Sequence, residues 1–196
     1  MNLVILKYNA GNIQSVEYAL ERIGCKATVT DDHEMILQAD KVIFPGVGEA
    51  SSAMKYLSER GLDKLLKELT MPVLGICLGM QLMCRYSEEN DTECLGIFDE
   101  EVRKFDTGIT GLKSPQIGWN TIYGLKSSLF KEVPENSYCY FVHGYYAAIG
   151  KHTIATTDYT RPYSSGLQKD NFYGVQFHPE KSAGAGEQIL KNFILL

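Results

Sequence analysis

One cysteine of the chain stands in a pattern that suits a nucleophile. Cys77 has Gly75 and Gly79 two residues away on either side; the apolar run 73–76 before it predicts a short buried strand, and helical spacing of apolar residues from Met80 onward predicts a helix. This G-x-C-x-G sequence matches the nucleophile elbow, in which small flanking residues permit a strained turn that raises the nucleophile above the sheet. Backbone amides at the start of the helix favour a thiolate there. Although cysteine is often a small buried apolar residue, this setting predicts that Cys77 is a nucleophile.

A histidine and a glutamate near the other end of the chain supply a candidate base and its partner. His178 follows a stretch, residues 173–177, that predicts a strand, and Pro179 ends it because proline cannot continue a central strand. His178 is then expected at the same edge of the sheet as Cys77, where Glu180 can accept a hydrogen bond that fixes the imidazole tautomer. This is the arrangement of nucleophile, base and orienting carboxylate. The spacing alone is equally compatible with a histidine that caps a strand and a glutamate in solvent.

The other three histidines carry weaker signals. His33 and His152 lie in polar, turn-like stretches, so we expect both to face solvent. His143 ends a β-prone segment, residues 138–143, where we expect a structural hydrogen bond, with a position at the rim of the site as the alternative.

The loop 45–48, with the sequence Pro-Gly-Val-Gly, follows an expected strand and allows three interpretations. A glycine-rich loop can hold phosphate, but neither G-x-G-x-x-G nor a P-loop lysine is present. The loop can equally be a tight turn. In the third interpretation its amides face Cys77 and, with the amide of Leu78, stabilise an oxyanion.

Alternating strands and helices are expected to position these residues. Apolar patterns predict strands at 3–6, 27–30, 41–44 and 73–76, helices at 13–23 and 50–69, the latter broken near Gly61, and a short helical turn at 34–39. Such alternation indicates an α/β fold with a doubly wound, mostly parallel central sheet flanked by helices. Ligands bind such sheets at the carboxyl ends of the strands, so the loops after residues 6, 44 and 76 are expected to converge there.

The second half of the chain predicts a β-rich segment instead. Short β-prone runs with turns dominate between residues 96 and 160, after a polar stretch, 87–93, that is expected to be a solvated loop. Residues 106–115, with two glycines and a proline, are expected to form an exposed loop, and a closing helix is expected at 186–195. Because no repeat, low-complexity tract or linker divides the sequence, we expect one domain over residues 1–196.

Composition narrows the class of protein. The 196 residues carry a formal net charge of −5, with 44% hydrophobic and 22% charged residues, which fits a globular protein and argues against a nucleic-acid partner. No run is long enough to cross a membrane, and the apolar start lacks the features of a signal peptide. The odd number of scattered cysteines fits a reducing compartment, so a cytoplasmic location is expected. No C-x-x-C pair occurs, so neither a disulfide framework nor a zinc site is expected, and no cofactor is indicated. The five cysteines are Cys25, Cys77, Cys84, Cys94 and Cys139.

Three motifs together resemble the class I (triad) glutamine amidotransferases. They are the loop 45–48, the stretch 75–81 and the stretch 174–180, Gly-Val-Gln-Phe-His-Pro-Glu, in the order the family has them. The resemblance implies glutamine hydrolysis by Cys77, His178 and Glu180: the thiolate attacks the side-chain amide, and the histidine protonates the departing ammonia and then activates water.

The same resemblance implies further site residues. Gly46 and Leu78 would be the oxyanion-hole donors. The residues implied to contact the substrate are Gly48, Gln81, Glu93, Gly144 and Tyr145. Glu93 would hold the substrate's amino group, although Cys94 follows it where the family usually has glycine.

Further motifs resemble one branch of that family, the glutaminase subunits of imidazole glycerol phosphate synthase. They lie at residues 8–16, 118–120, 140–143 and 179–182, so they span nearly the whole chain. The resemblance implies a heterodimer with a cyclase subunit, a (β/α)8 barrel of histidine biosynthesis that receives the ammonia. It also implies low glutaminase activity until this partner binds, with residues 46–47 and Lys181 in the interface region.

The sequence departs from the usual pattern of this branch at three places. Lys7 stands in place of a common aspartate, the pair 116–117 (Gln-Ile) in place of His-Met, and Gly144 in place of serine. None belongs to the triad, but they leave open a related subunit that feeds ammonia to a sugar-modifying enzyme. A non-catalytic thiol sensor on the same fold is a second alternative, against which the presence of both His178 and Glu180 argues.

Overall fold

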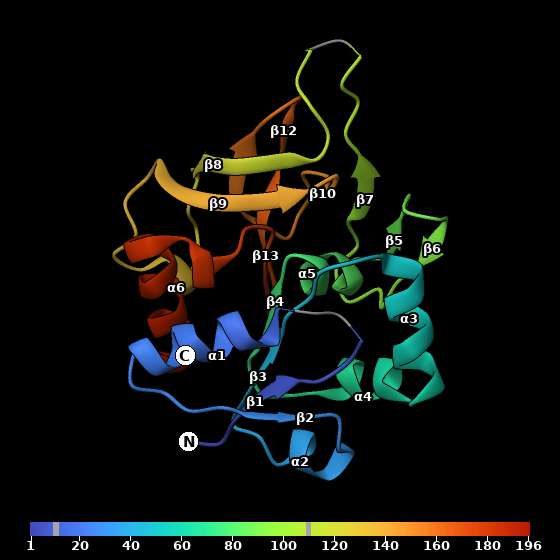
Figure 1. Ribbon diagram of the computed structural model, residues 1–196, viewed down its shortest axis with the longest axis vertical. Helices are drawn as coiled ribbons and strands as arrows, with labels where there is room; N and C mark the ends of the chain where they lie inside the picture. The colour runs from blue at the N-terminus through green and yellow to red at the C-terminus, as the bar shows by residue number, and fades with distance from the viewer. Residues whose placement is uncertain (10–11, 109–110) are drawn as a thin grey trace.

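Five parallel strands form one half of a large central sheet in the computed structural model, which describes residues 1–9, 12–108 and 111–196 (Figure 1). Every neighbouring pair of these strands is parallel, which confirms the predicted doubly wound α/β core. In spatial order the strands are β2 (Thr28–Thr30), β1 (Leu3–Leu6), β3 (Lys41–Phe44), β4 (Val73–Ile76) and β13 (Phe172–Val175).

Except for the edge strand β2, these strands are buried along their whole length because helices cover both faces of the sheet. Successive side chains of a strand alternate between the two faces: Val42 belongs to one core cluster and Ile43 to the other. Figure 1 shows two helices on one side of the sheet, α1 (Ile13–Arg22) and α6 (Ala183–Leu195). The helices on the other side are α3 (Ala50–Glu59), α4 (Leu62–Glu68) and α5 (Leu78–Met83).

Two local signals explain where the helices break and begin. The predicted break of the long helix is confirmed at Gly61, whose φ of 68° is a left-handed conformation that glycine adopts at little cost. The short helix α2 (His33–Leu37) begins after Asp32, whose carboxylate accepts the Met35 N–H at 2.9 Å.

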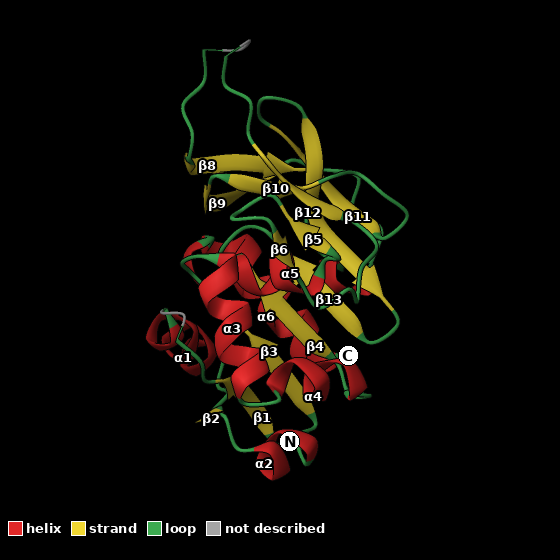
Figure 2. Cartoon of the chain, turned by 90° about the vertical axis from the view of Figure 1, so that its right-hand side faces the viewer, coloured by secondary structure: helices red, strands yellow, loops and turns green. Residues whose placement is uncertain are grey.

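The other half of the sheet is mostly antiparallel and forms the predicted β-rich segment. It continues from β13 through β12 (Pro162–Lys169), β10 (Tyr145–Ala147), β7 (Glu101–Lys104), β5 (Tyr86–Ser87) and β6 (Thr92–Glu93), with β11 (Thr153–Asp158) paired to β12. The strands β8 (Gln116–Ile122) and β9 (Ser137–His143) pair with each other as a separate sheet. Single 3-10 turns occur at η1 (Ser128–Phe130) and η2 (Pro179–Lys181). Figure 2 shows this strand-rich half above the helical half.

The stretch 87–93, predicted as a solvated loop, is in part a hairpin. Ser87 in β5 lies opposite Thr92 in β6, and both are buried. The hairpin forms because β5 also pairs with β7 and β6 contacts α3, neither of which is close in sequence. The described part of the 106–115 loop is irregular and mostly exposed as predicted; residues 109–110 of that prediction, and 10–11 of the motif at 8–16, lie outside the described residues.

The position of β13 brings the segment that contains His178 next to the turn that contains Cys77. This strand pairs in parallel with β4, and Val175 lies opposite Ile76. The strand ends at Val175, two residues earlier than predicted, and the chain then reaches His178 beside the turn that follows Ile76. Within the described part of the chain, no helix is long and apolar enough to cross a membrane.

Candidate active site

Cys77 occupies a strained turn between β4 and α5. Its φ of 53° and ψ of −108° lie outside the regions that non-glycine residues usually adopt, at a cost of about 1–3 kcal/mol. The Cys77 N–H donates to the Val175 carbonyl at 2.8 Å, and its carbonyl accepts the Gln81 N–H at 3.2 Å. The sheet and the first turn of the helix thus hold the strained residue from both sides, as a nucleophile elbow requires.

The glycines on each side of Cys77 are required by close packing. A Cβ on Gly79 would lie 1.8 Å from the Phe44 carbonyl oxygen, and one on Gly75 would lie 2.3 Å from the Met83 methyl group. Because real Cβ atoms do not approach other atoms this closely, a side chain at either position would push α5 away from the sheet. The G-x-C-x-G spacing is therefore a consequence of how tightly this turn packs.

His178 and Glu180 form a buried pair beside Cys77. The His178 N–H donates to the Tyr140 carbonyl at 2.9 Å, which ties the residue to β9. The turn η2 then brings Glu180 back, so that its Oε1 lies 2.8 Å from His178 Nδ1, with 3% and 0% of the two side chains exposed. With Nδ1 held by the carboxylate, His178 Nε2 is the ring nitrogen left for Cys77.

The neighbours of His178 favour its charged form. Burial alone would lower the pKa of the imidazole, but hydrogen bonds to Cys77 and Glu180, followed by their negative charges, outweigh burial and raise the pKa to about 10. The site therefore favours an imidazolium at His178 at neutral pH.

Glu180 is held by residues from the start of the chain. Asn12 Nδ2 donates to Glu180 Oε1, and Arg22 Nη2 donates to the Glu180 carbonyl at 3.3 Å. Asn12 lay in one of the recognised motifs, but sequence reasoning assigned it no role at the site. The contact depends on α1 packing beside η2, which local sequence does not reveal.

Cys77 and His178 face a cavity of about 180 Å³. Four of the predicted substrate contacts, Gly48, Gln81, Gly144 and Tyr145, are part of its wall. The cavity therefore gathers residues from five separate stretches of the chain, one of which contains the cysteine.

Glu93, predicted to hold the substrate's amino group, is exposed and lies in a different surface depression with Arg85 and Cys94. Glu89 lines the cavity in its place. The Glu89 carboxylate accepts the Ala50 N–H at 2.8 Å, and burial raises its pKa against the opposing effect of that hydrogen bond. The stretch 87–93 contains three glutamates, and sequence spacing did not reveal which one the hairpin β5–β6 turns towards Cys77.

Gly46 and Leu78, the two predicted oxyanion-hole residues, are close together, but the N–H of Leu78 already donates a hydrogen bond within the protein. The Leu78 N–H donates to the Gly46 carbonyl at 3.3 Å. Leu78 lines the cavity, whereas Gly46 is buried behind it, where a Cβ would lie 2.1 Å from the Tyr8 hydroxyl. In this conformation the Leu78 amide points at Gly46 rather than at a bound substrate.

His143 both lines the cavity and makes a structural hydrogen bond. Its Nδ1 lies 2.7 Å from the Tyr145 carbonyl oxygen and its Nε2 lies 3.2 Å from the Tyr163 hydroxyl. Burial, more than the nearby His178, lowers the pKa of His143 to about 4, although the bond to Tyr145 opposes this. A neutral His143 that donates to a carbonyl cannot act as the acid.

The remaining histidines lie elsewhere. His33 is exposed, as predicted, and its Nε2 lies 2.9 Å from the Arg60 carbonyl oxygen. The prediction that His152 faces solvent is wrong: it is buried, and its Nδ1 lies 2.8 Å from Glu100 Oε2. Its partner is 52 residues away in the sequence, so the local polar pattern was misleading.

Comparisons with known proteins agree with this geometry. Residues 4–196 match the family described as glutamine amidotransferase class-I. The chain belongs to the class-I glutamine amidotransferase family. It is 57% identical over 196 residues to the imidazole glycerol phosphate synthase subunit HisH of Bacteroides fragilis strain YCH46, covering 100% of both chains. It is 47% identical to the HisH subunit of Escherichia coli K12, covering 99% of both. These full-length identities place this amidotransferase in the HisH branch.

Solved structures show the same fold at low identity. A crystal structure titled as a glutamine amidotransferase has a TM-score of 0.75 with 16% identity, and covers 98% of this chain and 97% of that one. The PurLQS structure from Thermotoga maritima has a TM-score of 0.74 with 14% identity, and covers 99% and 97%. These likenesses confirm the class I amidotransferase fold.

Proposed function

We propose that this chain is the glutaminase subunit of an imidazole glycerol phosphate synthase, and that Cys77, His178 and Glu180 are its catalytic triad. The observation that carries the proposal is that Cys77 and His178 line the same cavity while the buried Glu180 carboxylate holds the His178 ring from behind. The full-length identity to HisH subunits supports the choice of enzyme.

In the first half of the reaction, the Cys77 thiolate attacks the side-chain carbonyl carbon of glutamine. A carbon–sulfur bond forms and the carbonyl oxygen becomes an oxyanion. The carbon–nitrogen bond then breaks as His178 Nε2 gives its proton to the amide nitrogen, and ammonia leaves a γ-glutamyl thioester behind. The raised pKa of His178 supports its presence as the imidazolium that this step consumes.

In the second half, water replaces the sulfur. Now neutral, His178 takes a proton from water as the oxygen attacks the thioester carbonyl, and glutamate leaves with the Cys77 thiolate restored. Glu180 keeps Nδ1 of the imidazole protonated and stabilises the imidazolium in both halves. Protons balance because the one given to ammonia is recovered from water.

Glu89 is proposed to hold the amino group of the substrate, the role that the family resemblance had suggested for Glu93. Its carboxylate is in the cavity wall with Cys77 and is partly desolvated. An ammonium group beside it would pair with its negative charge. Because the carboxylate is partly desolvated, this attraction would be stronger than the same ion pair in water.

The engaged Leu78 amide supports the expectation of low activity without a partner. For this N–H to stabilise the oxyanion, its bond to the Gly46 carbonyl must break, which requires residues 46–47 to change conformation. Val47 is exposed and also lines the cavity, so a partner that contacts it can act on this peptide. Partner binding is proposed to cause that change.

The partner is proposed to dock on the outer face of the β8–β9 sheet. Ile117 (65% exposed), Trp119 (52%), Tyr138 (64%) and Val142 (37%) are large apolar side chains that remain exposed there. Val142 is also part of the cavity wall, so this face continues into the site. We infer that its occupant is the cyclase subunit, the (β/α)8 barrel that the resemblance implies, with Lys181 also in the interface region.

The docking face has a direct test. Trp119→Glu should weaken the Kd for the cyclase subunit at least about tenfold, because a charge would replace a buried aromatic anchor. Lys55→Glu on the exposed side of α3 is the matched control and should bind normally. Binding of Trp119→Glu with unchanged affinity, measured by calorimetry, would show that the face is wrongly assigned.

The complete reaction would take place in the cytoplasm, with residues 1–196 acting as one amidotransferase domain. Glutamine and a phosphoribulosyl formimino carboxamide ribonucleotide are converted into imidazole glycerol phosphate, aminoimidazole carboxamide ribonucleotide and glutamate. The proposed path of the ammonia is from Cys77 to the cyclase subunit rather than into solution.

The function is tested by removing the nucleophile in the complex with the cyclase subunit. Cys77→Ala should abolish synthesis from glutamine but leave synthesis from added ammonium salt intact, with product nucleotides measured in both assays. Glutamine-dependent turnover that survives the substitution would contradict the assignment. Cys25→Ala, a partly exposed cysteine outside the cavity, is the control.

A further inference from the structure

We infer that Gln176 is a hydrogen-bond donor to the nucleophile and stabilises the Cys77 thiolate. This deepens, and rests on, the proposed function, whose first step needs that thiolate. Gln176 directly follows β13 and is completely buried. Its Nε2 lies 3.7 Å from Cys77 Sγ, a distance that suits an N–H···S hydrogen bond.

The orientation of the Gln176 amide is forced by its neighbours. The Tyr145 carbonyl can only accept hydrogen bonds, so the Gln81 side chain must turn its nitrogen towards it, at 2.9 Å. The same nitrogen lies 2.9 Å from Gln176 Oε1 and gives it the second hydrogen. With its oxygen occupied, Gln176 presents its NH₂ group to Cys77. His143, which also donates to the Tyr145 carbonyl, helps to hold that carbonyl in place.

Two neighbours of the sulfur favour opposite protonation states. The Val142 carbonyl oxygen lies 3.8 Å from Cys77 Sγ and can only accept a hydrogen bond, so it favours the S–H form. The Gln176 amide can only donate towards the sulfur, so it favours the thiolate. The Val142 carbonyl and the Gln176 amide therefore shift the protonation equilibrium of the Cys77 sulfur in opposite directions. Without Gln176, only His178 would counter the preference of the Val142 carbonyl for the S–H form.

The amide differs from His178 in that it does not titrate. His178 alternates between its charged and neutral forms as the reaction proceeds, so its attraction for the sulfur varies. The Gln176 donor is present throughout, including when the sulfur leaves the thioester as a thiolate. The backbone of Gln176 is held in place independently of its side chain, because the backbone N–H donates to the Ser165 carbonyl of β12 at 3.0 Å.

The test measures the reactivity of Cys77 without using glutamine. The intact chain is treated with iodoacetamide at a series of pH values, and modification of Cys77 is followed by peptide mass spectrometry. The thiolate attacks the methylene carbon, a carbon–sulfur bond forms and iodide leaves, so the rate follows the thiolate fraction. In Gln176→Met, which removes the donor at similar volume, we expect the midpoint of the pH profile to rise by about one unit.

Two further variants separate this role from packing. Gln176→Glu keeps the shape but places an ionisable oxygen beside the sulfur, and its midpoint should rise at least as far as that of Gln176→Met. Ser165→Ala is the matched control: Ser165 is completely buried on the neighbouring strand, and its hydroxyl has no hydrogen-bond partner in the described structure. Its midpoint should equal that of the unsubstituted chain.

The inference is overturned if the Gln176→Glu midpoint equals that of the unsubstituted chain, whether or not Gln176→Met folds. Circular dichroism at each pH establishes which variants are folded. Glutamate release by the unsubstituted chain with its cyclase subunit is measured separately. Its absence would count against the proposed function, while a raised midpoint in Gln176→Glu would still support the donor role.

Discussion

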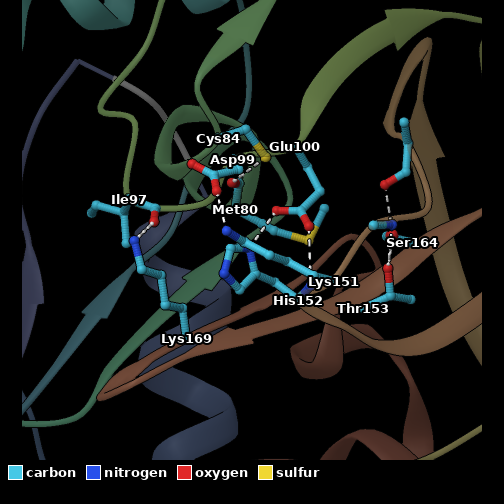
Figure 3. Close-up of polar contacts among 12 residues, drawn as sticks. Met80, Cys84, Ile97, Asp99, Glu100, Lys151, His152, Thr153, Ser164 and Lys169 are labelled. Atoms are coloured by element: carbon cyan, nitrogen blue, oxygen red, sulfur yellow. Dashed lines mark hydrogen bonds and ion pairs between the residues drawn. The ribbon is translucent and has the colours of Figure 1, made fainter.

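Two buried histidine–glutamate pairs in this molecule have the same geometry but different surroundings. His178 Nδ1 lies 2.8 Å from Glu180 Oε1, and His152 Nδ1 lies 2.8 Å from Glu100 Oε2. Both pairs are almost completely buried. His178 of the first pair lines the cavity with Cys77, whereas neither residue of the second pair lines that cavity. Figure 3 shows the second pair, Glu100 and His152.

The second pair is closed on itself. Glu100 accepts the His152 backbone N–H at 3.1 Å with Oε1 and the ring nitrogen with Oε2, so one residue occupies both oxygens. A Cβ on Gly150 would lie 2.4 Å from Oε1, which leaves no space there for another molecule. Figure 3 shows the pair beside the exposed ion pair of Lys151 and Asp99. This arrangement joins the start of β7 to the turn before β11 and has a structural role.

Each pair also has a cysteine near it. Cys84 at the end of α5 donates to the Met80 carbonyl at 3.6 Å, and burial, followed by the charges of Cys94 and Glu100, raises its pKa well above the usual value. It therefore remains a thiol, whereas Cys77 is at a strained turn, at the cavity and within reach of His178. Cysteine, histidine and glutamate in proximity are thus insufficient for catalysis: the elbow and the cavity make the difference.

The largest expected difference is in glutamine turnover between variants of His178 and His152. His178→Asn should lower glutamine turnover in the complex about 10²–10⁴-fold, because the acid and base of both half-reactions is lost. His152→Asn should leave turnover within about twofold at temperatures where it is folded, because the ring touches no reacting atom. Equal losses of kcat in the two variants would refute the distinction.

The Glu100–His152 pair should matter for stability, although not for turnover. Glu100→Ala leaves two buried N–H groups of His152 without an acceptor, so we expect the free energy of unfolding to fall by about 1–3 kcal/mol. Urea unfolding followed by circular dichroism measures it. Glu187→Ala, which removes an exposed ion pair with Lys191, is the control and should change the free energy of unfolding far less than Glu100→Ala. A Glu100→Ala variant as stable as the control would show that the closed pair contributes little.

The smallest expected effect concerns substrate binding. Glu89→Gln should raise the KM for glutamine about tenfold with a smaller change in kcat, while Glu93→Gln should change neither. The pKa of Glu89 is raised, and the carboxylate must be ionised to attract an ammonium group. The KM of the unsubstituted enzyme should therefore increase as the pH falls through that pKa, and this increase should be absent in Glu89→Gln. The measurement is the KM for glutamine as a function of pH in the complex. A raised KM in Glu93→Gln, with no change in Glu89→Gln, would show that Glu93 and not Glu89 binds the amino group.

Local patterns were sufficient for the parts of the site that local chemistry dictates. The strand, turn and helix around Cys77 follow from a short apolar run, two glycines and helical spacing within 14 consecutive residues, 73–86. The proline after His178 correctly indicated that the chain has left the sheet there, although the strand itself already ends at Val175. The parallel core follows because strands that are apolar on both faces need helices on both faces. These features need no information about distant segments.

Distant contacts decided the rest. The hairpin β5–β6 packs against α3 and turns Glu89, not Glu93, into the cavity. Glu100 buries His152 from 52 residues away. The sequence by itself predicted Cys77 as the nucleophile, and it determined the edge of the sheet at which Cys77 stands and the family of the chain. Tertiary structure alone decided which glutamate lines the cavity, which histidine is buried against Glu100 and which way the Gln176 amide points. Each of these depends on atoms that only folding brings close together.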